Sequence, residues 1–132
     1  MNPDLHIESK VIENFIIKSK RERYLNFIKK SKTRKKFTDE LAHFSNQLEL
    51  FEEIKNNERS VIDAQLKRLG LKGECYVISE NNELEGKRMA IDKALSEAIG
   101  MGMGTLIVFG DAELVFYEGE GPSDRWIKEL KK

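Results

Sequence analysis

The stretch TLIVFGDAELVFYE, residues 105–118, decides the fold of this chain of 132 residues. Its two apolar runs, residues 105–109 and 114–117, flank the pair Gly110 and Asp111. A glycine-led dipeptide between two apolar runs is typical of a β-hairpin. The first run is apolar at consecutive positions, which indicates a strand covered on both faces. The stretch therefore predicts a pair of strands in the interior of a sheet.

Two segments before this hairpin extend the sheet. Residues 75–78 form another continuous apolar run of strand length, and a brief extended piece is expected near residues 88–91. Between that piece and the hairpin, Asp92 is a suitable N-cap and Gly100 a suitable stop for a short helix. One side of this helix is apolar: Ala94, Leu95, Ala98 and Ile99.

The N-terminal half has the apolar spacing of helices. Apolar residues within 11–16 form one stripe, but those within 17–28 fall on a different side of the same helical wheel. One straight helix cannot bury both sets on one face. Ser19 and Glu22, three residues apart, form a capping box that resolves the conflict by starting a new helix. The two helices expected are residues 5–18 and 20–31.

Two more helices complete this half. Thr33 is a suitable N-cap for a third helix, whose apolar stripe is Phe37, Leu41, Phe44 and Leu48. A fourth helix begins with the capping signature of Ser60 and ends at Gly70, since glycine adopts the left-handed conformation that terminates helices.

The predicted order of elements is typical of the α+β class. We expect one domain, residues 1–132. Its helical part, about four helices at residues 5–70, packs on a small, mostly antiparallel sheet of three to four strands at residues 74–118, with one short helix between the strands. Residues 123–131 are expected to form a C-terminal turn or short helix. Trp126 in that segment either packs onto the body or anchors a partner.

Composition excludes several classes of protein. Lys and Arg number 23 and so do Asp and Glu, so no global field attracts nucleic acid or anionic lipid. A single cysteine excludes an intramolecular disulfide and a multi-cysteine zinc site. The longest uncharged stretch, residues 98–110, is far shorter than the roughly 20 residues of a membrane-spanning helix. Asp4 and Glu8 do not fit a secretory signal, so we expect a cytoplasmic protein without membrane or disulfide partners.

Positive charge is concentrated in the helical half. Residues 10–36 contain eleven basic residues but two acidic ones, whereas residues 74–124 contain eleven acidic residues but three basic ones. The basic helices, residues 18–36, are candidates for phosphate contacts and so for binding nucleic acid. The alternative is a pair of solvated helix faces, since no nucleic-acid-reading module is recognisable. The candidate basic residues are Lys18, Lys20, Arg21, Arg23, Lys29, Lys30, Lys35 and Lys36.

Carboxylates follow the predicted strands. If the strand ends meet on one edge of the sheet, these groups could hold a divalent cation or act as an acid–base pair. The alternative is a set of solvated acids that discourage edge pairing. The candidates are Glu80, Glu118, Glu120 and Asp124. The nearby GMGMGT, residues 100–105, follows a helix and precedes a strand, which is the reverse of the order in phosphate-binding glycine loops.

The remaining reactive side chains form no catalytic motif. His6 and His43 have no spacing typical of metal ligands, and Cys75 opens a buried strand without a basic neighbour to activate it. We therefore expect no cofactor, no metal and no catalytic residue. The leading hypothesis is a non-enzymatic module that binds another protein or a second copy of itself. Nucleic-acid binding is the second hypothesis, and a carboxylate-based or metal-assisted enzyme is the third.

Several segments together resemble a family of small uncharacterised bacterial cytosolic proteins. They are IESKVIENFI (7–16), KRERYLNFI (20–28), RKKF (34–37), CYVISENNELEG (75–86), GMGTLI (102–107) and FYEGE (116–120). The resemblance implies a bacterial cytosolic domain and carries no known activity, ligand or catalytic residue.

Overall fold

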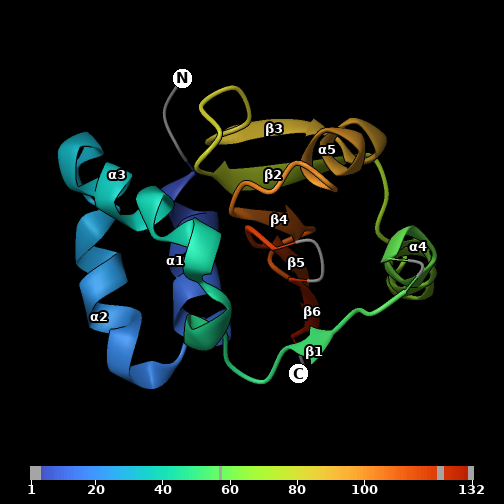
Figure 1. The fold of residues 1–132 in the computed structure, drawn as a ribbon, viewed down its shortest axis with the longest axis horizontal. Coiled ribbons are helices and arrows are strands. Elements are labelled where there is room, and N and C mark those ends of the chain that lie inside the picture. The colour runs from blue at the N-terminus through green and yellow to red at the C-terminus, as the bar shows by residue number, and fades with distance from the viewer. Residues whose placement is uncertain (1–3, 57, 122–123, 131–132) are drawn as a thin grey trace.

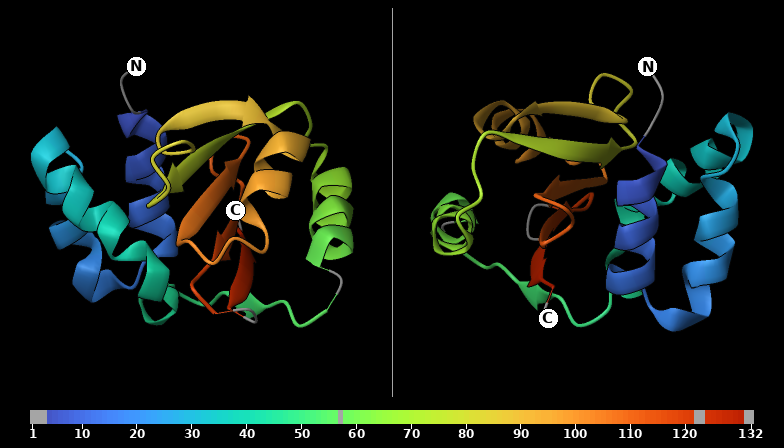
Figure 2. Two further views of the ribbon diagram at one scale, coloured as in Figure 1. Left: turned by 45° about the horizontal axis from the view of Figure 1, so that its top comes forward. Right: turned by 180° about the vertical axis from the view of Figure 1, so that it is seen from behind.

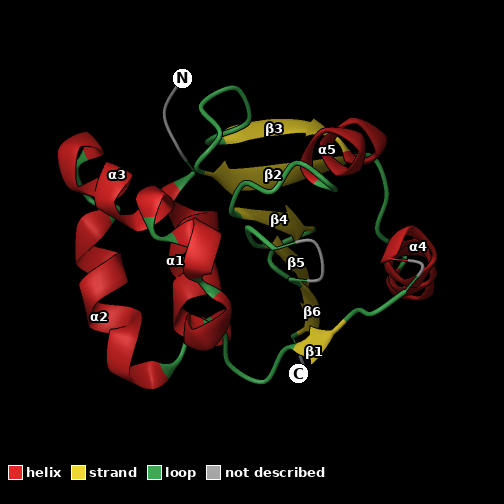
Figure 3. Ribbon diagram, in the orientation of Figure 1, coloured by secondary structure: helices red, strands yellow, loops and turns green. Residues whose placement is uncertain are grey.

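A six-stranded antiparallel sheet lies at the centre of the protein, with helices on both of its faces (Figure 1 and Figure 3). The structure is a computed structural model that describes residues 4–56, 58–121 and 124–130. In spatial order the strands are β1 (Glu52–Glu53), β6 (Arg125–Glu129), β5 (Leu114–Glu118), β4 (Thr105–Phe109), β2 (Glu74–Ser79) and β3 (Lys87–Ala90). Every neighbouring pair is antiparallel. The hairpin at 105–118 supplies β4 and β5 in the interior of the sheet, as predicted.

One face of the sheet packs against the N-terminal helices. These are α1 (Leu5–Phe15), α2 (Lys18–Phe27) and α3 (Ser31–Asp39), followed by the short 3₁₀ turns η1 (Leu41–His43) and η2 (Ser45–Gln47). Their apolar side chains form one core cluster with the sheet residues Tyr76, Ile78, Leu106, Val108, Val115 and Tyr117.

The other face packs against α4 (Glu58–Leu69) and α5 (Ile91–Ala98). Both views of Figure 2 show these helices on the side of the sheet opposite to α1–α3. Ile62 and Leu66 of α4 and Leu95 of α5 join a second core cluster with the sheet residues Cys75, Val77, Ile107, Phe109, Leu114, Phe116 and Ile127. The sheet is therefore the middle of three layers.

β4 shows why this architecture requires a continuous apolar run. Leu106 and Val108 belong to the cluster under α1–α3, whereas Ile107 and Phe109 belong to the cluster under α4 and α5. Side chains alternate between the faces of a strand, so a strand covered on both faces buries every residue. Burial of each such side chain contributes about 2 kcal/mol. The predicted two-sided cover of residues 75–78 and 105–109 is confirmed.

The α+β class and the antiparallel sheet are confirmed, but the predicted three to four strands were too few. Two strands lie outside the predicted sheet region. Residues 125–129 form β6 rather than the expected turn or short helix, because their backbone pairs along all of β5 and Ile127 is buried. β1 adds two residues beside β6.

Several predicted helix boundaries were wrong. α1 ends at Phe15 and α2 starts at Lys18, so Ser19 lies inside α2 and caps nothing. The third helix stops at Asp39. Of the rest of its apolar stripe, Leu41 lies in η1, Phe44 lies between η1 and η2, and Leu48 follows η2. Thr33 does not cap it: its hydroxyl donates to the carbonyl of Phe27 at 2.8 Å. Tertiary packing of the buried stripe thus overrides the local capping signals.

The other two predicted N-caps also lie inside their helices. α4 already includes Glu58, two residues before Ser60, and the residue before α5 is Ala90 rather than Asp92. The predicted stops are present, since Gly70 and Gly100 have φ angles of 70° and 87° just after these helices. No described helix is both long enough and apolar enough to cross a bilayer.

Candidate functional site

Two of the predicted acidic residues, Glu80 and Glu118, lie at the same end of the sheet and hydrogen-bond to the protein itself. β2 and β5 both pair antiparallel with β4, so Glu80, which follows β2, and Glu118, the last residue of β5, lie at the same end of the sheet. Glu118 is buried and accepts hydrogen bonds from the amide of Gly100 and from Nε of Arg125, both at 2.8 Å. Glu80 accepts from the amide of Gly104 at 2.8 Å. Both carboxylates therefore anchor the glycine-rich segment between α5 and β4.

The other two predicted acids have separate partners. Glu120 lies 3.0 Å from Nε2 of the exposed His43, and Asp124 accepts from the indole Nε1 of Trp126 at 2.7 Å. Within residues 4–56, 58–121 and 124–130, no group of three His, Cys, Asp or Glu residues could hold a metal ion. Each of the four predicted acidic residues therefore has a partner within the protein.

The predicted basic residues fall into two groups. Three pair with nearby carboxylates: Arg21 with Glu49 at 2.8 Å, Arg23 with Glu40 at 3.2 Å, and Lys35 with Asp39 at 3.3 Å. The other five have no carboxylate partner among the described residues: Lys18, Lys20, Lys29, Lys30 and Lys36. The charge of α2 and α3 is thus partly neutralised but not cancelled.

Arg34 belongs to a buried structural network instead of the basic surface. Its guanidinium forms a two-point ion pair with the fully buried Glu8, and its Nε donates to Glu85 at 2.7 Å. The hydroxyl of Tyr76 also donates to Glu8, at 2.6 Å. Although burial opposes the charge, the hydrogen bonds to Glu8 and Glu85 raise the pKa of Arg34. This network joins α1, α3 and β2 and leaves Arg34 unavailable to a ligand.

Cys75 lies in an environment that does not activate its thiol as a nucleophile. Burial, with a smaller effect of the neighbouring Glu74, raises the pKa of its thiol to about 12. Because the thiolate is the reactive form, a buried thiol of this kind is not a nucleophile near neutral pH. The structure records Cys75 as a free cysteine.

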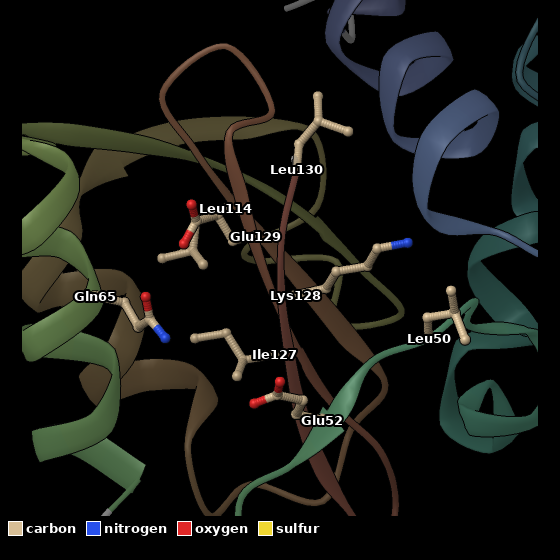
Figure 4. A pocket seen from close by; sticks show the side chains of 8 residues that line it. All are labelled: Leu50, Glu52, Gln65, Leu114, Ile127, Lys128, Glu129 and Leu130. Carbon is tan, nitrogen blue, oxygen red and sulfur yellow. The ribbon is translucent and has the colours of Figure 1, made fainter. Parts of the chain in front are cut away.

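A groove of about 400 Å³ lies along β6, beside α4 and the start of β1 (Figure 4). Its volume lies at the small end of the range typical of ligand sites. The groove is lined by Leu50, Glu52, Gln65, Leu114, Ile127, Lys128, Glu129 and Leu130. In Figure 4, Gln65 projects from α4 on one side of β6, and Leu50 lies on the other side, so the groove straddles the strand.

Leu50 combines two unfavourable features, a positive φ angle and an exposed apolar side chain, which occur together in no other described non-glycine residue. It is a leucine with a φ angle of 57°, and its side chain is 84% exposed. The left-handed conformation costs a residue with a Cβ roughly 1–2 kcal/mol. An exposed, strained apolar residue at the rim of a groove suggests selection for something other than stability.

The conformation of Leu50 leaves part of β6 without a neighbouring strand. β1 pairs Glu52 with Ile127 and Glu53 with Trp126, so an extended chain would next place Leu50 opposite Glu129. Instead the amide of Glu49 donates to the carbonyl of Phe15 at 3.0 Å, and the chain turns towards α1. The edge of β6 is therefore open after Ile127.

The open edge presents a free backbone position. The amide of Leu130 donates to the carbonyl of Glu113 on the β5 side at 2.9 Å, and that of Ile54 donates to the carbonyl of Arg125 on the β1 side at 2.8 Å. Backbone groups alternate in direction along a strand, so the N–H and C=O of Glu129 face the open edge. Within the described part of the chain, neither group has a hydrogen-bond partner.

The charges around the groove are unequal. Glu129 pairs with Arg68 of α4, and Nζ of Lys128 donates to the carbonyl of Glu49 at 2.8 Å. Glu52, in contrast, is exposed and has no ion-pair partner among the described residues. The neighbouring Glu53 has one ion-pair partner among the described residues, Lys55, whose Nζ lies 4.0 Å from its Oε1. The rim next to β1 is therefore acidic.

Comparison of the chain with family models, with curated proteins and with solved structures returned no match. The resemblance to small bacterial cytosolic proteins therefore stays an expectation from sequence. The groove and the open strand edge were not predicted. The sequence carries no clear signal for this strand: residues 126–130, WIKEL, are two apolar, two charged and one apolar residue, without the strict alternation of a half-buried strand.

Proposed function

We propose that this protein is a binding domain that holds an extended segment of a partner protein against the open edge of β6. The observation that carries the proposal is the backbone N–H and C=O of Glu129, which have no hydrogen-bond partner among the described residues and lie in a groove with apolar walls. A peptide in extended conformation offers the complementary pair of backbone groups, as in other cases of strand addition to a sheet edge.

The lining of the groove supports a particular kind of segment. The exposed Leu50 and the half-buried Leu130 provide apolar surface beside β6, so apolar side chains at alternate positions of a bound strand would find contacts there. The acidic rim at Glu52 and Glu53 favours a basic residue at one end of the segment. A small molecule would fill the groove but would not need the strand edge.

The experiment is selection of peptides from a random library on the immobilised protein, followed by calorimetry with each selected peptide. We expect peptides with alternating apolar residues and a basic end. Leu50→Asn should weaken binding about ten-fold or more, because it removes an exposed apolar contact of the groove. The matched control is Met101→Asn, which changes another exposed apolar residue at a distant loop.

Two readouts separate strand addition from other binding. In amide hydrogen exchange, a bound peptide should slow exchange of the Glu129 amide, because that amide becomes hydrogen-bonded. Equal loss of affinity in the two variants, or peptides that leave the Glu129 amide unprotected, would contradict the proposal. Light scattering on the free protein measures its oligomeric state. A dimer would indicate that a second copy occupies the strand edge, which would also contradict the proposal.

A further inference from the structure

A second surface, on the opposite helical layer, carries concentrated positive charge. We name it the α2–α3 face and define it by six lysines that have no carboxylate partner among the described residues: Lys18, Lys20, Lys29, Lys30, Lys32 and Lys36. α2 and α3 stand at the edge of the molecule, away from the sheet (Figure 1). The proposal below does not depend on the groove at β6.

Cations from both helices converge on this face. Arg23 of α2 lies 5.0 Å and Lys36 of α3 lies 5.9 Å from the centre of the same ring, that of Phe27. Lys29, Lys30 and Lys32 occupy the connection between the two helices and the start of α3. These charges therefore form a ridge at the end of α2 and the start of α3, whereas Lys18 and Lys20 lie at the other end of α2.

Little opposite charge compensates the ridge. Residues 18–36 contain ten basic residues and one acidic residue, Glu22. The three nearest ion pairs, to Glu49, Glu40 and Asp39, engage Arg21, Arg23 and Lys35 and leave the six lysines unneutralised. Because the whole chain has zero formal charge, attraction to a polyanion must come from a local excess of positive charge such as this one.

The face lacks the side chains that strengthen binding to membranes or to single strands. Its aromatic residues Tyr24 and Phe37 are fully buried, and the ring of Phe27 lies under Arg23 and Lys36, so no ring is free to stack on a base. The exposed large apolar residues of the described chain, Leu5, Leu50 and Met101, all lie outside residues 18–36, which leaves nothing to insert into a bilayer. Phosphates on a regular duplex need only the lysines.

We propose that the α2–α3 face binds the phosphate backbone of a nucleic-acid duplex without reading its sequence. The test is fluorescence anisotropy with a labelled double-stranded DNA oligonucleotide and its RNA counterpart at low salt. About four lysine–phosphate contacts predict a loss of affinity of about 100-fold between 50 and 200 mM salt. Two duplexes of unrelated sequence should bind equally.

Two charge-matched triple variants locate the surface. Lys29→Glu, Lys30→Glu and Lys32→Glu together should weaken duplex binding at least ~10-fold and reduce the salt dependence, because each reversal removes a phosphate contact. The control, Lys67→Glu, Lys72→Glu and Lys93→Glu, makes the same change of net charge at exposed lysines of the opposite half and should alter affinity by less than about 2-fold. Thermal melting checks that both variants fold.

Four results would overturn the proposal. They are no binding of either duplex at low salt, equal losses in the two triple variants, tighter binding of single-stranded oligonucleotides, and tighter binding of anionic phosphatidylglycerol vesicles or of polyglutamate. The peptide-binding proposal at the β6 groove can fail without affecting this one, because Leu50→Asn should leave the affinity for the duplex unchanged.

Discussion

Leu50 and Glu129 would be cross-strand neighbours if β1 began two residues earlier, since Glu52 pairs with Ile127 in an antiparallel register. The left-handed backbone of Leu50, with φ of 57°, prevents this pairing and leaves the backbone of Glu129 open. The strain at one residue therefore creates the candidate binding edge at the other.

The strain at Leu50 should be measurable as stability. Leu50→Asn should raise the free energy of unfolding by about 0.5–1 kcal/mol, because asparagine tolerates the left-handed conformation and the leucine side chain buries little surface. Leu50→Ala is the matched control, since alanine keeps the strain. Urea denaturation measures both, and an asparagine variant no more stable than the alanine variant would contradict the assignment of strain.

Gly104 should tolerate no side chain. A Cβ at this position would lie 2.1 Å from the backbone carbonyl carbon of Leu41, so η1 would have to move. Gly104→Ala should cost about 3 kcal/mol by overpacking. At Gly121 the nearest atom to an added Cβ is 3.8 Å away, so Gly121→Ala should cost less than about 0.5 kcal/mol. Thermal denaturation of the two variants compares them, and similar melting temperatures would refute the close approach of η1.

The buried pair of Glu8 and Arg34 should be costly to break. Glu8→Gln leaves the buried guanidinium with Glu85 as its anionic partner, and removal of one member of a buried ion pair costs about 3 kcal/mol. Lys35→Gln removes an exposed pair with Asp39 and should cost less than about 0.5 kcal/mol. Chemical denaturation measures both. A Glu8 variant as stable as the Lys35 variant would show that the network does not hold α1 to α3.

Asp4 should make stability depend on acid pH. Burial disfavours its charged form, yet hydrogen bonds from the amide of Ile7 and from Arg88 hold its pKa below the ordinary value of 3.8. The charged carboxylate therefore stabilises the folded state above that value, and this contribution is lost as the pH falls through the lowered pKa. Asp4→Asn keeps a capping oxygen but cannot titrate.

The free energy of unfolding, followed between about pH 5 and pH 2, tests this expectation. The wild-type protein should lose more stability over that interval than the Asp4→Asn variant. Parallel curves would mean that Asp4 is not the group responsible. Asp111 is a second aspartate for comparison. Its hydrogen bond with Lys10 lowers its pKa as well, but at an exposed position where solvent screens the interaction.

The interior strands were predictable because their signal is local. β2, β4 and β5 are apolar at consecutive positions, and Gly110, with φ of 63°, marks the turn between the last two. Helix starts were less predictable. Ser19, Thr33, Ser60 and Asp92 each fit a capping pattern, but each lies inside a helix that begins one or two residues earlier.

The candidate sites were predictable to different degrees. The density of lysines in residues 18–36 is a property of composition, so the basic surface follows from the sequence. The sequence does not show which of these basic residues are neutralised. Arg34, for example, is buried against Glu8, which belongs to another helix. The convergence of Glu80 and Glu118 at one edge needed the strand order, and their capture of glycine amides needed the path of residues 99–104.

Residue order alone was sufficient for the α+β class, the central hairpin and the basic character of the second and third helices, since each depends on neighbours within a few positions. The tertiary structure decided that the C-terminal segment is a strand, that Arg34 is structural, and that Glu129 faces an open edge. These three outcomes depend on contacts between segments far apart in the chain, and the free energy of such contacts is not encoded in any local pattern.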